Sequence, residues 1–228
     1  MNTFTIMASV AIEHAYRELV PMFESASGVK VQTVWSPSVK MIERLKGGEV
    51  VDLVLLSSVA IESLIEAQVL ARGSRTDLVT SIVGVAVKQG AARPDTSSAD
   101  KLKAALLAAP SVGISTGPSG IYMNKLFERL GLTQALQPKL KVYTGTPVGE
   151  FVASGEVALG FQQVAELMPV GGIDYWPVSD DVQSVTTFSI GEHLKATNLE
   201  AGRKWVQFLI SPAAGPVMRK HGVEPVRR

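Results

Sequence analysis

The 228-residue sequence contains no cysteine, which excludes disulfide bonds, thiolate metal sites and cysteine nucleophiles. Aromatic residues make up only 6% of the chain, so few side chains are available to stack on nucleic-acid bases. The 22 basic and 21 acidic residues nearly balance, and no basic block is longer than Arg227-Arg228. Nucleic acids and anionic membrane surfaces are poor partners for such a chain, because both require concentrated positive charge.

Long hydrophobic runs are also absent, and no stretch of about 18 apolar residues predicts a membrane span. The segment Met1–Ser9 reads at once as a strand, without the charged and apolar regions of a signal peptide. Two interpretations follow: a periplasmic protein whose signal peptide has been removed, which we favour, or a cytoplasmic protein. The composition, 46% hydrophobic and 19% charged, is that of a globular protein, which we expect to be a monomer.

The three histidines, His14, His193 and His221, are scattered along the chain. None has a second histidine or an acidic residue at the spacing of a metal site. We therefore expect neither a metal ion nor another cofactor.

Apolar strand patterns alternate with helical patterns along the sequence, which predicts an α/β fold with ligands at the carboxyl ends of the strands. The run Val51–Leu56 is almost wholly apolar, as in a parallel strand covered on both faces. Two further runs, Leu78–Lys88 and Val185–Ile190, look like strands that cross between lobes. The prediction is two lobes, each a mostly parallel sheet flanked by helices, with a cleft between them: residues 1–80 with 188–228, and residues 81–187.

The segment Ser111–Tyr122 reads as a short strand, a loop of small and hydroxyl residues, and a helix from Tyr122 onward. Backbone N–H groups at a helix start, together with a serine hydroxyl, can hold a small anion without any cationic side chain. Similar strand–serine–helix patterns occur at Ser9 and Ser38. Both serines could instead be ordinary helix caps, and Tyr122 could be either a core residue or a ligand contact.

These motifs, in this order, resemble type II periplasmic solute-binding proteins, most closely the molybdate-binding branch, over essentially the whole chain. The resemblance extends to Gly155-Glu-Val-Ala-Leu-Gly160 and to the ending Phe208–Ala214. It implies a two-lobed binding fold that takes a small anion and delivers it to the membrane component of an ABC transporter. By position, the resemblance implies that the hydroxyls of Ser9 and Ser38 bind the ligand from the first lobe. From the second lobe, it implies donors at the helix start of Ser119 and Gly120 and the backbone donor of Val148.

One segment departs from the molybdate-binding pattern. Where those relatives usually carry a tyrosine that reaches the oxyanion, this chain has Leu159-Gly-Phe-Gln-Gln163, with Gln162 near the ligand position. A glutamine both donates and accepts hydrogen bonds, which suits a carboxylate with further polar groups better than a bare oxyanion. The Gly-Phe-Gln-Gln segment resembles a subgroup of the same family that includes aconitate isomerase, and this resemblance implies a tricarboxylate ligand.

Two functions follow from these observations. The first is a non-catalytic binding protein for a small anion, either an oxyanion or a di- or tricarboxylate. The second is an isomerase of the aconitate type, which needs an acid–base group to move a proton between two carbons. The sequence does not rank the candidates for that group, which are Glu13, His14, Tyr122, Glu150 and Glu166. A cytoplasmic ligand sensor is a third alternative.

Overall fold

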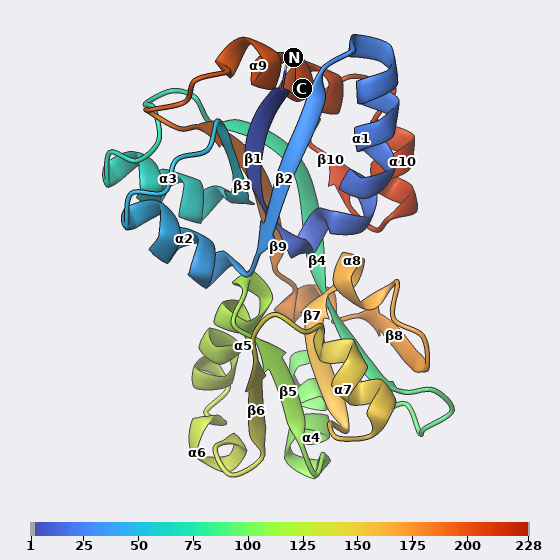
Figure 1. Ribbon diagram of the computed structural model, residues 1–228. Coiled ribbons are helices and arrows are strands. Elements are labelled where there is room, and N and C mark those ends of the chain that lie inside the picture. Colours follow the sequence, from blue (N-terminus) through green and yellow to red (C-terminus); the bar gives the residue numbers. More distant parts are fainter. Residues whose placement is uncertain (1–2, 228) are drawn as a thin grey trace. The chain divides into compact units, whose positions relative to one another are not determined.

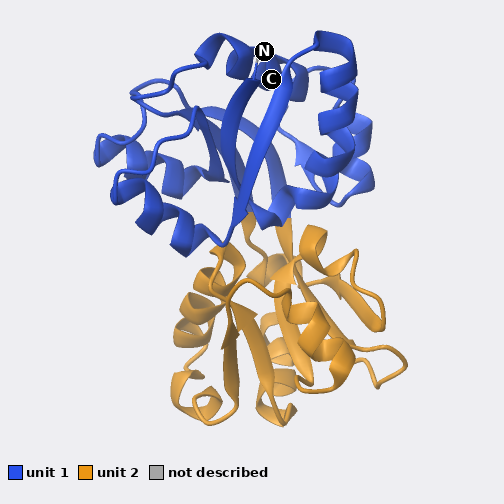
Figure 2. Ribbon diagram, in the orientation of Figure 1, with its two compact units in different colours: residues 1–81, 186–228 blue, residues 82–185 orange. Residues whose placement is uncertain are grey.

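The computed structural model describes residues 3–227 of the chain, which form two compact units (Figure 2). Unit 2 is the continuous segment 82–185, and unit 1 contains the described residues on either side of it. The predicted lobe limits lie within two residues of these. The chain leaves unit 1 within the long strand β4 (Thr76–Lys88) and returns at β9 (Val185–Glu192), which belongs to unit 1 except for Val185.

The sheet of unit 1 has the strand order β2-β1-β3-β9-β4, with β10 paired to β4 (Figure 1). Strand β1 pairs in parallel with both β2 and β3, whereas β9 runs antiparallel to β3. The strands not yet delimited are β1 (Thr3–Ser9), β2 (Lys30–Ser36), β3 (Leu53–Ser57) and β10 (Glu224–Pro225). Four consecutive β3 residues are fully buried, as their apolar run predicts for a strand covered on both faces.

Helices cover both faces of this sheet (Figure 1). Helices α2 and α3 share a hydrophobic cluster with β3, and the rings of Tyr16 and Phe23 on α1 each lie 5.0 Å from Trp205 on α9. Helix α1 ends at Gly28, whose φ of 67° is the left-handed conformation that glycine adopts without strain. The bounds are η1 (Val10–Ile12), α1 (Glu13–Ser27), α2 (Ser38–Lys46), α3 (Ser58–Glu66), α9 (Leu199–Leu209) and α10 (Gly215–Lys220).

The sheet of unit 2 has the order β8-β4-β7-β5-β6. Strand β5 runs parallel to β6 and β7, whereas β7 and β8 run antiparallel to β4. The strands are β5 (Val112–Ser115), β6 (Leu140–Tyr143), β7 (Leu159–Gln163) and β8 (Ile173–Pro177). The helices are α4 (Ala99–Ala108), α5 (Pro118–Arg129), α6 (Thr133–Leu136), α7 (Val148–Ser154), α8 (Val164–Leu167) and η2 (Asp180–Val182).

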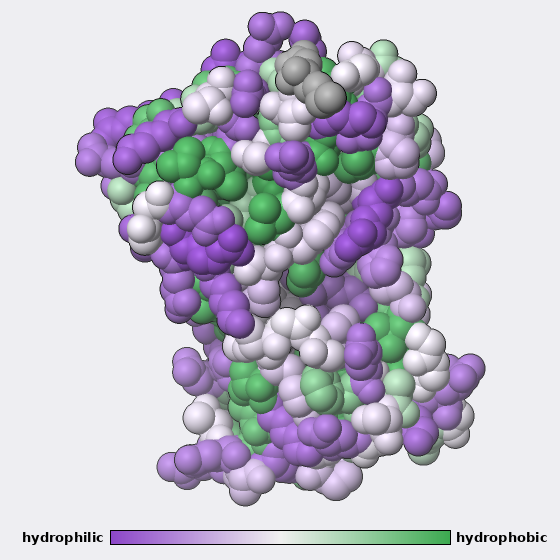
Figure 3. Space-filling view, viewed as in Figure 1, coloured by the Kyte–Doolittle hydropathy of each residue, from purple (hydrophilic) through white to green (hydrophobic). Residues whose placement is uncertain are grey.

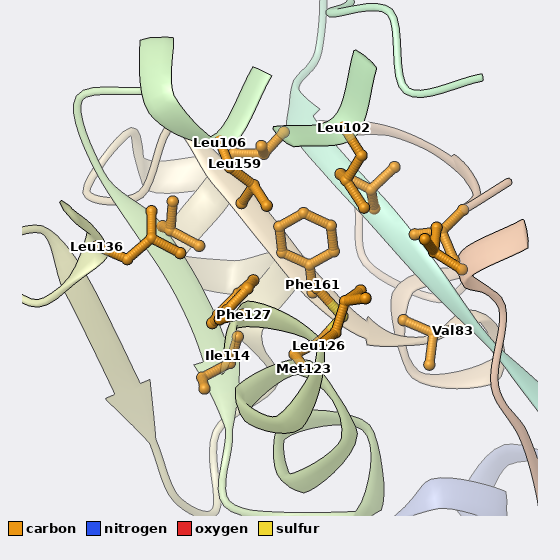
Figure 4. Packing of buried hydrophobic residues seen from close by; sticks show 14 of the residues in the cluster. Val83, Leu102, Leu106, Ile114, Met123, Leu126, Phe127, Leu136, Leu159 and Phe161 are labelled. Carbon is orange, nitrogen blue, oxygen red and sulfur yellow. The ribbon is translucent and has the colours of Figure 1, made fainter. Parts of the chain in front are cut away.

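The core of unit 2 is built around Phe161 of β7 (Figure 4). Its ring lies among leucines of α4 and the apolar face of α5, and meets the Phe127 ring edge-on at 6.5 Å. On the other face of the sheet, α7 packs so closely on β7 that a Cβ at Gly160 would lie 2.5 Å from Cγ2 of Val152. The position of α7, and of the loop before it, is therefore fixed by close packing against β7.

The predicted α/β architecture is confirmed, with differences of detail. The prediction missed β8, α6, α8 and the two-residue β10, all of which are short. It also placed the start of α5 too late: the helix begins at Pro118, not Tyr122, because proline is well suited to the first helical position. Among residues 3–227, no helix is long and apolar enough to span a membrane. On the face shown in Figure 3, hydrophilic side chains are spread over both units, interrupted by smaller apolar areas.

Candidate functional site

Three parallel strands of unit 1 end at one edge of its sheet. The pairing register sets Ser9 at the end of β1 beside Ser36 at the end of β2, and Ala8 beside Leu55 of β3. Each strand is followed directly by a helical segment. The helix starts that carry Ser9 and Ser38 are therefore brought to the same edge, where ligands of α/β folds bind.

The two predicted serines of unit 1 differ in their surroundings. Ser9 is buried, and its Oγ lies 3.4 Å from the backbone N of Ala11, a long hydrogen bond at the start of η1. Ser38 is the first residue of α2, after Pro37, and is partly exposed. The Ser9 hydroxyl thus has a capping contact, but a weak one, and remains able to donate its own proton to an acceptor.

Unit 2 repeats this arrangement with β5, β6 and β7, which are also parallel to one another. Their carboxyl ends are Ser115, Tyr143 and Gln163, and the chain continues from them into α5, α7 and α8. Three strand ends and three helix starts of unit 2 therefore share one edge. The predicted residues Ser119, Val148 and Gln162 all lie there.

The start of α5 is tightly built. The backbone N–H of Gly117 donates to Oγ of Ser115 at 3.2 Å, and the Ser115 and Ser119 hydroxyls are 3.3 Å apart. The sequence placed Ser119 and Gly120 in a loop, but both are buried in the first turn of the helix, where N–H groups have no intrahelical partner. Gly120 packs directly on the strand before it: an added Cβ would lie only 1.6 Å from the carbonyl oxygen of Ser115.

Gln162 lies inside the protein at the end of β7. Its side-chain oxygen accepts the backbone N–H of Val148 at 2.7 Å, and its amide Nε2 donates to Oε1 of Glu166 at 2.8 Å. The side chain is 3% exposed, and the neighbouring Gln163 is fully buried, so neither is a solvated loop residue. Two groups that the sequence proposed as separate ligand donors, the Val148 N–H and the Gln162 amide, are bonded to each other.

Glu166 completes this chain of hydrogen bonds. Burial raises the pKa of its carboxyl to about 7, although hydrogen bonds from the Gln162 side chain and the Gln163 backbone N–H act in the opposite direction. Glu166 is the third residue of α8 and bonds the backbone N–H of the capping residue Gln163, as in half of a capping box. A carboxyl whose pKa lies near neutrality suits a group that both takes and gives protons.

The other acid–base candidates are exposed or have other hydrogen-bond partners. The hydroxyl of Tyr122 donates to the carbonyl oxygen of Val182 at 2.7 Å, while its ring packs against the unit 2 core. Glu13 accepts a 2.7 Å hydrogen bond from Nε of Arg17, His14 is exposed, and Glu150 is exposed on α7. The sequence analysis did not separate Glu166 from these, although a glutamate three residues after a possible helix cap was a usable signal.

The rest of the described chain offers no competing metal site. Within residues 3–227, no group of three histidine or acidic side chains is placed to hold a metal ion. Two surface pockets of unit 2, of about 420 and 470 Å³, share Arg93 and Trp176. The Arg93 guanidinium lies 3.9 Å from the centre of the Trp176 ring, and no predicted site residue lines either pocket.

Comparison with known sequences gives a consistent result. Residues 4–224 match a family described as bacterial extracellular solute-binding protein. A curated relative, aconitate isomerase from Pseudomonas sp., is 36% identical over 233 residues, covering 99% of this chain and 89% of the relative.

Solved structures share the fold at low sequence identity. A periplasmic molybdate-binding protein from Azotobacter vinelandii superposes with a TM-score of 0.78 at 16% identity, covering 99% of both chains. A sulfate-binding protein from Mycobacterium tuberculosis superposes with a TM-score of 0.80 at 16% identity, covering 99% of this chain and 88% of that one. The family expected from the order of the motifs is thereby confirmed, and the chain belongs to the bacterial extracellular solute-binding proteins.

Proposed function

We propose that this protein binds a small anion through hydroxyl and backbone N–H donors at its helix starts. The observation that carries the proposal is the repeated arrangement in which, in each unit, three parallel strands end at one edge and lead directly into helices. Ser9 and Ser38 contribute from unit 1, and Ser119 and Gly120 from unit 2. The donors of both units take part in binding the ligand.

Such donors suit an anion that must be bound and later released. A hydrogen bond from a neutral donor to a charged acceptor contributes about 1.5–3 kcal/mol, and several together give useful affinity. The hydroxyls and N–H groups point from a rigid framework of strands and helix starts, so little ordering is needed when the ligand arrives.

Among small anions, we propose a di- or tricarboxylate ahead of molybdate or sulfate. The edge of unit 2 carries the carboxyl group of Glu166, held by Gln162, and below its pKa of about 7 this group can donate a hydrogen bond to a ligand carboxylate. The 36% identical relative, whose name is aconitate isomerase, supports the same ligand class.

A second candidate function is isomerisation of a tricarboxylate, as in aconitate. This reaction moves a double bond by removing a proton from one carbon and returning it to another, and it needs no metal or redox partner. The relative's name and the near-neutral pKa of Glu166 favour it. Hydrogen-bond donors at the helix starts would stabilise the negative charge that develops on the substrate.

Calorimetric titration tests the binding function directly. The protein is titrated with cis-aconitate, trans-aconitate, citrate, molybdate, tungstate and sulfate. We expect saturable binding of at least one carboxylate, with weaker or no binding of the inorganic oxyanions. Preference for molybdate or sulfate would contradict the carboxylate assignment, and no binding of any of the six would contradict the proposal as a whole.

Serine variants test the contribution of each unit. Ser9→Ala and Ser119→Ala should each weaken binding by about 10- to 100-fold, the equivalent of one charged hydrogen bond. Ser63→Ala, at an exposed position on α3, is the matched control and should bind like the unchanged protein. Loss in only one of the two site variants would restrict the site to that unit.

The family assignment also bears on the cellular role. As a member of an extracellular solute-binding family, the protein is proposed to act outside the cytoplasm, as a monomer, and to deliver its ligand to an ABC transporter in the membrane. Fractionation of cells expressing the natural gene tests the location. Retention in the cytoplasm would favour the ligand-sensor alternative.

A further inference from the structure

We propose that Glu166 is the acid–base residue that moves the proton in tricarboxylate isomerisation, with Gln162 as the residue that positions it. This inference rests on the second candidate function. It singles out one of five candidates that the sequence left equal.

The position of Glu166 is the first argument. Helix α8 follows β7 directly, so Glu166 lies at the edge of unit 2 where the parallel strands β5, β6 and β7 end. Ser119 lies at the same edge, at the start of α5. Proposed anion donors and a carboxyl group are thus contributed by neighbouring strand ends. Glu13 and His14 belong to α1 of the other unit, and the Tyr122 hydroxyl is bonded to Val182.

The hydrogen bonds around Glu166 are the second argument. Gln162 holds the Val148 N–H through its oxygen, at 2.7 Å, which leaves its amide nitrogen directed at Glu166, at 2.8 Å. The orientation of the amide is therefore determined by the backbone of α7, and the Glu166 carboxyl is held in one place. A general base must be fixed in this way to reach a proton on carbon.

A purely structural role is the alternative. Glutamate at the third position of a helix often bonds the N–H of the capping residue, and Glu166 does so. Glutamine also serves in that role, since its side-chain oxygen accepts the same hydrogen bond, although it has one acceptor oxygen fewer for the bond from Nε2 of Gln162. A structural cap therefore tolerates Glu166→Gln, whereas a proton-transferring group does not, because an amide cannot take the proton.

The proposed reaction balances without any co-reactant. The Glu166 carboxylate removes a proton from the methylene carbon next to the double bond, and the C–H electron pair forms a new double bond to the central carbon. The electrons of the old double bond move to the far carbon and its carboxylate. Glu166 then returns a proton to that far carbon, which restores its own charge and completes the shift of the double bond.

The charge state of Glu166 depends on few neighbours. Helix α8 packs against α7, β7 and β8, and its Val164 and Leu167 side chains also approach Gly84 of β4. The titratable residues of these elements are Glu150, Asp174, Tyr175, Asp77 and Lys88. None of these is among the causes of its pKa shift, which are burial and the hydrogen bonds from Gln162 and Gln163. The acidic limb of the pH profile of kcat/KM should therefore report Glu166 of the free protein, with an apparent pKa near 7.

Three proteins are compared: the unchanged chain, Glu166→Gln, and Glu128→Gln as a matched control at an exposed position near the end of α5. Conversion of cis- to trans-aconitate is followed by ultraviolet absorbance, and exchange of the methylene protons in deuterated water by NMR. Glu166→Gln should lower kcat at least about 100-fold and remove the acidic limb. Its melting temperature and its affinity for trans-aconitate should stay close to those of the unchanged chain, and Glu128→Gln should change none of these.

Each result separates the proposals. If the unchanged protein binds aconitate but neither isomerises it nor exchanges its protons, the assignment of Glu166 is wrong while the binding function stands. If it isomerises aconitate and Glu166→Gln does so within about threefold, another residue is the base. If Glu166→Gln loses activity but its affinity and melting temperature also fall, a second variant, Glu166→Asp, is used to distinguish a catalytic role from a structural one. If Glu166→Asp is measurably active and the acidic limb of its pH–rate profile is shifted, the assignment is supported. If the profile of Glu166→Asp has no acidic limb, the assignment is wrong.

Discussion

The side-chain oxygen of Gln162 accepts the backbone N–H of Val148 at 2.7 Å, joining the end of β7 to the start of α7. The bond is buried, and the other end of the same side chain donates to Glu166. One glutamine therefore satisfies a helix-terminal N–H and orients a carboxyl group. Its replacement should affect both stability and chemistry.

Gln162→Met keeps the length of the side chain but removes its donor and its acceptor. The Val148 N–H is then left unsatisfied in the interior, and we expect a loss of about 1–3 kcal/mol in the free energy of unfolding. Denaturant unfolding measures the change. Gln134→Met, at an exposed position on α6, is the control and should alter stability by less than about 0.5 kcal/mol. Equal effects in the two variants would show that the buried hydrogen bond contributes nothing.

Gly120→Ala should disrupt the start of α5. The added Cβ would lie 1.6 Å from the Ser115 carbonyl oxygen and 2.6 Å from its carbonyl carbon, and backbone atoms cannot move aside as a flexible side chain can. We expect a loss of stability above about 3 kcal/mol, or no folded protein. Gly171→Ala is the matched control, because no atom lies within 4 Å of its added Cβ. A Gly120→Ala protein with an unchanged melting temperature would contradict this close packing.

Tyr122→Phe distinguishes two roles of one hydroxyl. The structure bonds it to the Val182 carbonyl oxygen at 2.7 Å, so the variant should lose about 0.5–1.5 kcal/mol of stability. Affinity for the anion should stay within about twofold if that is the hydroxyl's whole role. A fall in affinity of tenfold or more, measured by calorimetry, would instead support the direct ligand contact that the sequence suggested.

Asp52 makes unit 1 sensitive to acid. Burial alone would raise the pKa of its carboxyl, but hydrogen bonds from Thr5, Asn198 and Thr197 outweigh burial and hold the pKa below its ordinary value. Both oxygens are used: Oδ2 accepts the Thr5 N–H at 2.7 Å, and Oδ1 accepts the Thr197 and Asn198 N–H groups, each at 2.8 Å. The carboxylate thereby ties β1 to the start of α9.

The sign of the pH effect follows from this depressed pKa. The stabilisation by Asp52 is fully present above the unfolded pKa of about 3.9 and is lost as the pH falls through the lower folded value. We expect Asp52→Asn to cost about 2 kcal/mol or more at pH 7 and to reduce the drop in stability below about pH 4. Urea unfolding between pH 7 and pH 2.5 measures both. An equally steep acid loss in Asp52→Asn would assign that loss to other carboxyls.

Much of the fold could be predicted from the sequence because it depends on local patterns. Apolar runs such as Val51–Leu56 fix a buried strand, and a serine after a strand marks the helix start that follows. Short elements escaped because their signal is weak: β8 has five residues and follows two glycines, and α8 has only four.

The site could be predicted only in part, since its decisive contacts join residues that no local pattern connects. Gln162 meets Val148 across 14 positions, and this pairing depends on how α7 packs on β7. The near-neutral pKa of Glu166 arises from burial, which sequence spacing does not report. The start of α5 could have been predicted from the sequence, because Pro118 occupies the first helical position, where proline is favoured.

The interrupted course of unit 1 has a consequence for how the chain is made. In its sheet, β9 lies between β3 and β4, so the parallel strands near the N-terminus lack their neighbour until the residues up to Glu192 have been synthesised. Unit 2 needs only residues 82–185, which leave the ribosome earlier. Until then the edge of β3 has no partner, and an open strand edge favours aggregation. The unit that comes second along the chain is therefore the first that can be complete, and the nascent unit 1 passes through a stage in which its central strands need protection.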